Sequence, residues 1–285
     1  MHVKKLLYQR EPNNEMNVAI MISTYPADQN IKNHLITRGF EEKKEIAGYK
    51  TYTWKNLTMY ETEAKTCLEL ENIDKEIEAD LFVFATIHQS ASKHPCLTCH
   101  PIGNWDKAEH GGNERTIYQS SAAYWKMFYL RLKELSSDID ITLEATHHGP
   151  HVEKPTLFVE IGSGEEQWND PKFGDILAEC IMDVFTKEPI DVKACIVLGG
   201  GHYNSAVMKL FEQSDWSVGH VCPKFMLETL DEDTLRQAID NTIPKAEMVA
   251  LDHKGLGSSR EKVKELLDRM NIPYDKARNL YNKKE

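Results

Sequence analysis

The sequence lacks the long apolar stretch of a membrane protein. None of its 285 residues lies in a run that approaches the roughly 18 apolar residues needed to cross a bilayer. Residues 1–14 carry basic side chains but only a very short apolar run, which does not fit a signal peptide. No internal repeat or low-complexity linker interrupts the chain. We therefore expect a cytoplasmic globular protein with no membrane partner, long enough to bury a core without disulfides.

Cysteine is scarce, and its six copies are scattered. They do not resemble a disulfide framework, so we expect reduced, mostly buried thiols. Residues 96–100 spell C-x-x-C-H, the pattern that attaches c-type haem. The lack of an export signal argues against haem. A structural zinc site formed by Cys96, Cys99 and His100 is the better alternative, although no second C-x-x-C is present to complete it.

Two motifs that would define a reaction are also missing. No G-x-G-x-x-G follows a strand, so we expect no dinucleotide partner. No G-x-S-x-G elbow is present, which argues against a serine hydrolase of that type. The sequence does contain Gly199, Gly200 and Gly201 between a predicted strand and a predicted helix. This arrangement can present backbone N–H groups and a helix N-terminus to an anion.

Basic residues are fewer than acidic ones, so the formal net charge is −11 at pH 7. This balance argues against a nonspecific nucleic-acid binder. Residues 254–285, however, hold nine Lys or Arg and five Asp or Glu, against 25 and 40 in the rest of the chain. A basic end on an acidic body fits a polyanionic partner, although a solvated helix explains the charge equally well. The candidate phosphate contacts are Lys224, Lys254, Arg260, Lys262 and Lys264.

Predicted strands and helices alternate along the chain, which indicates an α/β/α three-layer fold. We expect one domain over residues 1–285. A predicted hairpin, with a turn at Lys55-Asn56, makes the central sheet mixed. Residues 88–113 are rich in Gly, Pro and His and are expected to form a long functional loop. The predicted strands cover residues 18–22, 49–54, 57–62, 81–87, 141–146, 156–161, 193–198, 217–222 and 247–251. The predicted helices cover residues 28–38, 69–79, 118–135, 205–213, 231–241 and 258–270, with another from the Asp170-Pro171 cap, and Ser258 and Glu261 form a capping box in the last.

The most informative stretch is residues 142–168, where His147, His148 and His151 follow a predicted strand. A second predicted strand, 156–161, ends in Gly-Ser-Gly, and we expect the two strands to end side by side. In open α/β sheets ligands bind at that edge. A single histidine at a strand end is usually only solvated, but three in one turn favour a functional site.

Histidines and carboxylates follow several other predicted strands. They include His88, residues 94–100, residues 160–165, His202, His220 and residues 252–253. Their convergence would suit a metal-assisted or an acid/base hydrolytic site. Zinc accepts His and carboxylate ligands and keeps an open position for water. Alternatively, one of His147, His148 or His202 is the general base, while the amides of residues 199–201 stabilise an oxyanion.

Five motifs occur together and in order. They are residues 146–150 (THHGP), residues 160–163 with Trp168, residues 199–203 (GGGHY), residues 219–220 with 223–224, and residues 97–100 with 103–104. Together they resemble the archaeal and plant type of D-aminoacyl-tRNA deacylase, over nearly the whole chain from about Val18. The resemblance implies hydrolysis of the ester that joins a D-amino acid such as D-tyrosine to tRNA. It also implies zinc and a fold similar to peptidyl-tRNA hydrolase and purine nucleoside phosphorylases.

We accordingly expect a monomeric zinc enzyme that acts on D-aminoacyl-tRNA, with up to two zinc ions per chain. The predicted catalytic residues are His147, His148 and His202. The predicted substrate-binding residues are Gly199, Gly200, Gly201, Asn104, Lys224 and Lys254. The predicted metal ligands are His100, His148, His151, Glu160 and His202. Two alternatives stay open, namely a phosphorylase-like or peptidase-like metal enzyme acting on a small molecule, and a nonenzymatic zinc- or RNA-binding module.

Overall fold

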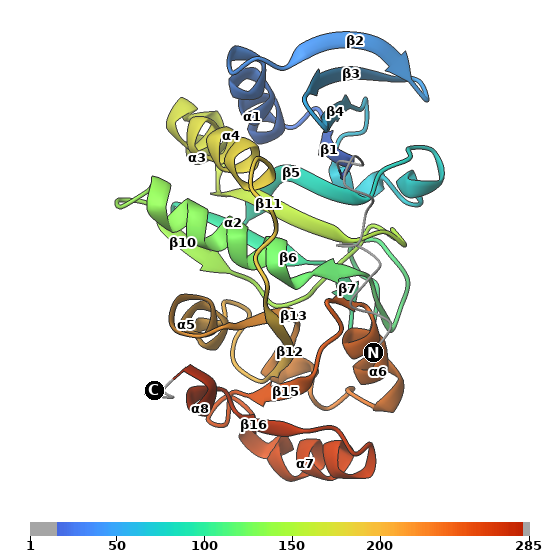
Figure 1. Ribbon diagram of the computed structural model, residues 1–285, viewed down its shortest axis with the longest axis vertical. Coiled ribbons are helices and arrows are strands. Elements are labelled where there is room, and N and C mark those ends of the chain that lie inside the picture. The colour runs from blue at the N-terminus through green and yellow to red at the C-terminus, as the bar shows by residue number, and fades with distance from the viewer. Residues whose placement is uncertain (1–15, 282–285) are drawn as a thin grey trace.

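An eight-stranded sheet and a four-stranded sheet follow one another down the long axis of the molecule (Figure 1). The structure is a computed structural model and describes residues 16–281. The larger sheet has the order β10-β6-β11-β5-β1-β4-β3-β2 and the smaller one β13-β12-β15-β16. The larger sheet consists of β1 (Val18–Ile22), β2 (Glu41–Ile46), β3 (Tyr49–Trp54), β4 (Leu57–Glu61), β5 (Leu81–Gln89), β6 (Cys96–Pro101), β10 (Asp140–Leu143) and β11 (Thr156–Ser163).

The smaller sheet is parallel throughout, whereas the larger one is mixed. Its strands are β12 (Lys193–Leu198), β13 (Trp216–Cys222), β15 (Met248–Leu251) and β16 (Tyr274–Lys276). Two short pairs join β7 (Gly103–Asn104) to β8 (Thr116–Ile117) and β9 (Ser120–Ser121) to β14 (Thr242–Ile243). The predicted α/β fold with a mixed central sheet is thus confirmed, but its strands are divided between two sheets.

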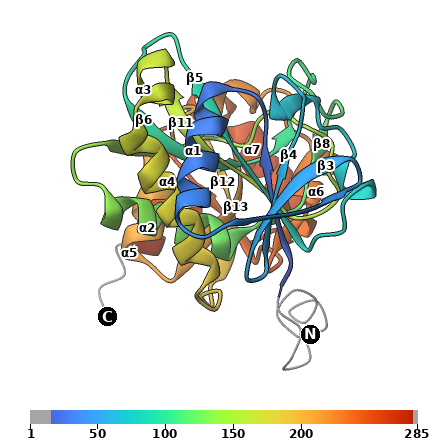
Figure 2. The same cartoon turned by 90° about the horizontal axis from the view of Figure 1, so that it is seen from above.

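Helices cover the sheets on both sides. Seen from above, α1 (Pro26–Thr37), α2 (Ala122–Leu135) and α4 (Pro171–Phe185) lie together on one side of the molecule, and α6 (Glu232–Asp240) lies on the other (Figure 2). The remaining helices are α3 (Glu165–Asn169), α5 (Ser205–Gln213), α7 (Arg260–Arg269) and α8 (Ala277–Tyr281). Asp170 caps α4 by accepting the Lys172 N–H, and Pro171 opens the helix, as predicted.

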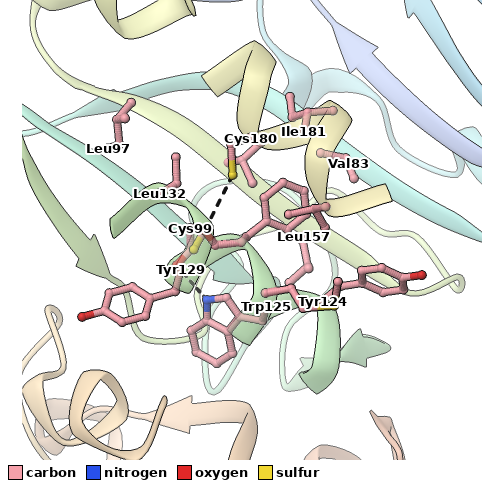
Figure 3. Close-up of a cluster of buried hydrophobic side chains, with 14 of the residues drawn as sticks. Val83, Leu97, Cys99, Tyr124, Trp125, Tyr129, Leu132, Leu157, Cys180 and Ile181 are labelled. Atoms are coloured by element: carbon pink, nitrogen blue, oxygen red, sulfur yellow. Dashed lines mark hydrogen bonds between the residues drawn. The ribbon is translucent and has the colours of Figure 1, made fainter. Parts of the chain in front are cut away.

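The main apolar core lies between α2, α4 and one face of the larger sheet (Figure 3). Leu97, Leu157 and Val83 pack there against the helices, and the Trp125 indole N–H donates to the Cys99 carbonyl at 3.0 Å. The same cluster includes Val197 from the smaller sheet. The two sheets therefore share apolar packing, and the single-domain organisation stays a prediction.

Strand β6 is the principal correction to the predicted elements. Residues 88–113 were expected to form a loop, yet residues 96–101 make a fully buried strand between β10 and β11. Strand β6 is parallel to β10 and antiparallel to β11. The expectation that residues 141–146 and 156–161 end side by side is therefore wrong, because these strands are not neighbours and run in opposite directions.

The pleat of β6 also shows whether Cys96 and Cys99 of the C-x-x-C-H pattern can act together. Successive side chains of a strand point to opposite faces, so residues three apart never share a face. Cys99 lies in the helix-covered core, whereas the Cys96 thiol lies 3.7 Å from the Ser163 hydroxyl on the other face. The two thiols lie on opposite faces and can neither hold one zinc ion nor attach one haem, so the structural zinc site and the haem alternative are both wrong for this pair.

Other predictions differ in smaller ways. The strands 18–22, 49–54 and 193–198 and the helix 205–213 have the predicted bounds. Strand β2 was not predicted, because its sequence EEKKEI is charged and every residue is exposed. Residues 69–79 hold short 3-10 turns instead of a helix. The expected capping box at Ser258 is wrong, since α7 begins at Arg260 and its N-cap, Ser259, makes no side-chain cap bond.

Candidate active site

The floor of the site is the face of the larger sheet that α2 and α4 do not cover. Paired residues of neighbouring strands project to the same face, and Glu160 of β11 pairs with Thr98 of β6 and Thr86 of β5. Thr98 pairs in turn with Thr142 of β10. These four side chains form a polar row across the sheet. Two residues further along each strand, the same face carries Glu144 and His100 on one side of this row and His88 on the other.

A loop from the smaller sheet lies against the end of β10. The Ala145 N–H donates to the His202 carbonyl at 2.7 Å, and the Asn204 N–H donates to the Leu143 carbonyl at 3.0 Å. Glu144 and Tyr203 form an antiparallel bridge between the two segments. The loop after β12 therefore meets the end of β10, although the two strands belong to different sheets.

Four histidine rings meet at this junction. The ring centroids of His100 and His147 are 4.2 Å apart, and those of His147 and His148 are 4.3 Å apart. His202 lies 4.5 Å from His147 by the same measure. The side chains of His147 and His202 keep 32% and 33% of their surface exposed, so a solute can reach them. The prediction that His147, His148 and His202 share a pocket agrees with this geometry, but its topological reason, one common sheet, is wrong.

Backbone carbonyls fix three of these rings. Nδ1 of His100 lies 3.1 Å from the Pro101 carbonyl, that of His147 lies 2.8 Å from the Ala145 carbonyl, and that of His148 lies 2.5 Å from the Gly149 carbonyl. A carbonyl can only accept, so each Nδ1 carries the proton and each Nε2 keeps its lone pair. Histidines oriented in this way are ready to bind a metal ion or accept a proton.

Glu144 is a fully buried carboxylate at the centre of the cluster. Its Oε2 accepts a hydrogen bond from His202 Nε2 at 2.7 Å, and its Oε1 lies 3.2 Å from His88 Nδ1. Burial alone would raise the pKa of Glu144, but the His202 hydrogen bond and the charges of His100, His147 and His88 outweigh it and lower the pKa. Glu144 is therefore an anion that links histidines from three segments.

The pKa values of the histidines separate into two groups. Burial, then the charge of His100, holds the pKa of His147 and of His148 well below its usual value. Burial would also lower the pKa of His100, but the nearby carboxylates of Glu160 and Glu144 raise it. Burial likewise opposes the raised pKa of His88, which Glu160 and Glu144 outweigh. The site thus contains neutral and readily protonated imidazoles side by side.

Three sets of side chains are close enough to hold a metal ion. Each set offers ligand atoms that lie within 4.8 Å of one another. Two buried atoms of these sets, His100 Nε2 and Glu144 Oε1, have no hydrogen-bond partner within residues 16–281. His100 and Glu144 belong to different sets, so cations in two of the sets would satisfy these atoms, and the donors fit a metal such as zinc. The sets are His100 with His147 and His148, Glu144 with His147 and His202, and His88 with Glu144 and Glu160.

A strained loop carries His148. Its φ of 45° lies in the left-handed region, which costs a non-glycine residue free energy. The Gly103 N–H donates to the His148 carbonyl at 2.8 Å and holds this conformation. A Cβ on Gly149 would lie 2.3 Å from the Gly112 nitrogen, so only glycine fits there. The loop is thus braced from two sides, and this places the ring of His148.

The structure leaves several predicted site residues outside the cluster. His151 Nδ1 contacts the Asn113 side-chain amide at 2.8 Å, and this histidine belongs to none of the three sets. Asn104 is buried and donates to the Gly111 and Asn113 carbonyls, so it braces a loop. Lys224 and Lys254 are exposed on neighbouring loops. The metal role of His151 and the substrate contacts of Asn104, Lys224 and Lys254 stay predictions.

The glycine turn is largely engaged within the chain. The Gly199 N–H donates to the Cys222 carbonyl at 2.9 Å, and the Gly200 N–H donates to the Gly255 carbonyl at 3.3 Å. Asn204 caps α5 by accepting the N–H groups of the next turn. Within residues 16–281, the Gly201 N–H is the amide of this turn that makes no bond. The turn therefore serves mainly to present His202, and it offers an anion fewer donors than the sequence suggested.

Sequence reasoning missed Glu144 and did not select His88. Glu144 stands in the polar half of an alternating strand, where a carboxylate is normally solvated. The signal that could have identified it is its place three residues before His147, on the strand that delivers the histidines. Among the described residues, no helix combines the length and apolar character needed to cross a bilayer.

Fold and site together define an α/β enzyme whose histidine–carboxylate centre is suited to hydrolysis. A model of the D-aminoacyl-tRNA deacylase family matches residues 75–274. The D-aminoacyl-tRNA deacylase of Pyrococcus furiosus is 33% identical over 92% of this chain and 100% of its own length. That of Methanosarcina barkeri is 35% identical over 71% of this chain and 68% of its own length. The chain belongs to the D-aminoacyl-tRNA deacylase family, as its motifs predicted.

A solved structure supports the fold independently. The crystal structure of a conserved protein of unknown function superposes with a TM-score of 0.86 at 28% identity, covering 95% of this chain and 98% of that one. The predicted likeness to peptidyl-tRNA hydrolase and purine nucleoside phosphorylases stays a prediction, as do the monomeric state and the cytoplasmic location.

Proposed function

We propose that the chain hydrolyses the ester of D-aminoacyl-tRNA at the junction of His147, His148 and His202, and so clears tRNA of D-amino acids. The family supplies the reaction class. The single observation that carries the location is the cluster of four histidine rings around the buried Glu144. Ester hydrolysis needs an activated water, a group that receives its proton, and stabilisation of the oxyanion that forms.

We assign the proton transfer to His202. Its Nε2–H donates to Glu144 Oε2 at 2.7 Å, which leaves Nδ1 with a lone pair. Nδ1 can take the proton of the attacking water, and the buried carboxylate stabilises the imidazolium that results. The same proton can then pass to the ribose oxygen that leaves when the ester bond breaks. The products are the free D-amino acid and tRNA with an intact terminal hydroxyl.

We assign zinc to His100, His147 and His148. Their Nδ1 protons are bound to backbone carbonyls, so three Nε2 lone pairs are free to act as ligands. A zinc ion in such a site lowers the pKa of a bound water and polarises a carbonyl. The carboxylate of Glu160, 3.6 Å from His100 Nε2, would place negative charge beside the ion. The free amide of Gly201, directly before His202, is the donor we propose for the oxyanion.

The test is release of amino acid from charged tRNA. D-tyrosyl-tRNA and L-tyrosyl-tRNA should be compared, each with and without a chelator, using protein purified without a histidine tag. We expect release of D-tyrosine only, and loss of that activity with the chelator. No release of either amino acid would contradict the proposed reaction. Full activity in the chelator, with zinc well below one ion per chain, would contradict the zinc assignment alone.

A further inference from the structure

The aromatic side chain of Phe225 is exposed to solvent near the active site. It keeps 60% of its surface exposed and lies in the 3-10 turn η3 (Lys224–Met226), directly after β13. Exposure of so much apolar surface costs free energy, because water gains by its burial. Tyr203, which follows the catalytic His202, is 42% exposed as well.

Two contacts of the neighbouring Lys224 place the turn that carries Phe225. The Lys224 N–H donates to the Gly200 carbonyl at 2.9 Å, which places the turn two residues from His202 along the glycine loop. The Lys224 side chain runs over Gly257, since a Cβ there would lie 2.6 Å from its Cε. The turn that carries Phe225 therefore contacts both the glycine loop before His202 and the loop that follows β15.

The loop after β15 lies beside a cluster of basic side chains. Arg260 Nη2 donates to the His253 carbonyl at 3.0 Å. Lys264 is one helical turn further along α7 and so shares the face of Arg260. Lys276 pairs with Leu251 at the end of the smaller sheet, two residues before His253. Basic groups from α7 and β16 thus surround the loop after β15.

These charges act together on His253. Its pKa lies below the usual value because of desolvation first, and then because of Arg260, Lys276, Lys264 and Arg278. Lys264 has an ion-pair partner within its own helix. Arg260, Lys276 and Arg278, by contrast, pair with no carboxylate within residues 16–281. An unneutralised basic cluster on a chain of net charge −11 is suited to a polyanion.

We propose that Phe225 is a stacking platform for an unpaired base at the 3′ end of tRNA, and that the basic cluster receives the phosphates of the adjoining acceptor stem. This inference rests on the proposed function. The ester lies on the last ribose of a single-stranded end, which must cross the rim to reach the histidines. Proteins hold single strands by stacking bases on aromatic rings and by placing cations along the backbone.

Three variants and their matched controls test the platform. Phe225→Ala removes the ring and Phe225→Trp keeps a stacking surface. Ile46→Ala, which removes a 45% exposed apolar side chain on β2, is the control. The charge variant reverses Lys254, which is exposed on the loop after β15, together with Lys276 and Arg278 of the basic cluster, to Glu. Its control makes the same change in charge at three exposed lysines elsewhere, Lys44, Lys133 and Lys187.

Binding of uncharged tRNA and turnover of D-tyrosyl-tRNA should both be measured over a range of salt. We expect Phe225→Ala to raise Kd and KM by about 5- to 100-fold with kcat unchanged, and Phe225→Trp to bind like the wild type. The effect of Phe225→Ala should vanish with tRNA that lacks its three terminal nucleotides. The charge variant should flatten the slope of log Kd against log salt by about two to three units.

The outcomes separate this proposal from the proposed function. If the wild type hydrolyses D-tyrosyl-tRNA but Phe225→Ala and the charge variant bind tRNA like their controls, the platform is refuted and the reaction stands. If the wild type releases no D-tyrosine, the proposed function fails, while tRNA binding still decides the platform. Weakened binding of the truncated tRNA by Phe225→Ala would also refute base stacking at the 3′ end.

Discussion

Glu144 and His202 are joined by a 2.7 Å hydrogen bond although they follow strands of two different sheets. Glu144 comes at the end of β10, and His202 lies in the loop after β12. The bond therefore forms only when the two sheets are packed together. Assembly of the catalytic pair and docking of the sheets are one event.

We expect Glu144→Gln to lower kcat on D-aminoacyl-tRNA by about 10²- to 10⁴-fold, the usual contribution of a working general base. Glutamine keeps the size of the side chain but cannot stabilise the imidazolium of His202. Glu165→Gln, at an exposed position of α3, is the control and should leave kcat unchanged. Urea unfolding of both variants separates catalysis from stability, and an unchanged kcat in Glu144→Gln would contradict the assigned role.

His148→Ala and His202→Ala should each reduce kcat by about 10²-fold or more while leaving the fold intact, since partly exposed rings on loops contribute little to the core. His94→Ala is the matched control, because that ring pairs with Asp140 at the surface, away from the cluster. Single-turnover kinetics and circular dichroism are the measurements. Normal turnover in both site variants would place the chemistry elsewhere.

Zinc removal should lower the melting temperature. A ligand bound to the folded state stabilises it by about 4 kcal/mol when present at 1,000 times its Kd. Thermal unfolding should therefore shift down in a chelator and recover when zinc is added. His148→Ala is expected to abolish this response, because one of the three proposed ligands is gone. Equal melting curves with and without the chelator would speak against a resident ion.

Asp28 gives a pH dependence of stability that is separate from the site. Burial raises its pKa to about 6, against 3.8 in a free chain, although Ser23, Thr86 and Cys67 donate to it. The folded state thus holds the proton more tightly, and folding stability falls as pH rises from about 4 to about 6 and then levels off.

Asp28→Asn should remove this dependence. The variant should gain stability relative to the wild type between pH 4 and pH 6, by roughly 1–3 kcal/mol in all. Urea unfolding at pH 4.5 and pH 7 measures the difference, with Asp191→Asn at an exposed position as the control. Parallel stability profiles for the variant and the wild type would show that Asp28 is not the responsible group.

Gly149→Ala should destabilise the protein by about 2 kcal/mol or more and reduce activity with it. The added Cβ would lie 2.3 Å from the Gly112 nitrogen, and neither backbone segment can yield easily. Gly164→Ala is the control, since its Cβ would meet nothing closer than 3.7 Å. A stable, fully active Gly149→Ala variant would mean that the loop carrying His148 is not braced there.

Local sequence predicted much of the fold but not the neighbours of each strand. Strand β12 and helix α5 have the expected bounds because an apolar run and a cap residue are local signals. Strand β6 escaped prediction because Thr98 and His100, two of its six residues, are polar and buried in the site. Which strands lie side by side depends on contacts between residues far apart in the sequence. A single sequence does not reveal these contacts.

The site could be predicted in part for the same reason. His147, His148 and His202 stand in clear motifs after strands, and they do meet. Glu144 carries no motif, since its importance comes from burial on a floor formed by four strands. His151 belongs to the same sequence cluster as His148, yet the chain turns at Gly149-Pro150 and carries it to the Asn113 loop. Its closeness to His148 in the sequence therefore led us to overestimate the contribution of His151 to the site.

The three rings proposed to hold zinc are oriented by main-chain carbonyls, those of Pro101, Ala145 and Gly149. Mutation changes side chains and leaves carbonyls in place, so no single substitution can delete this support directly. During evolution or engineering, such a site can exchange much of its surroundings and keep its ligand geometry. Attempts to retune it would have to reshape the loop backbone itself.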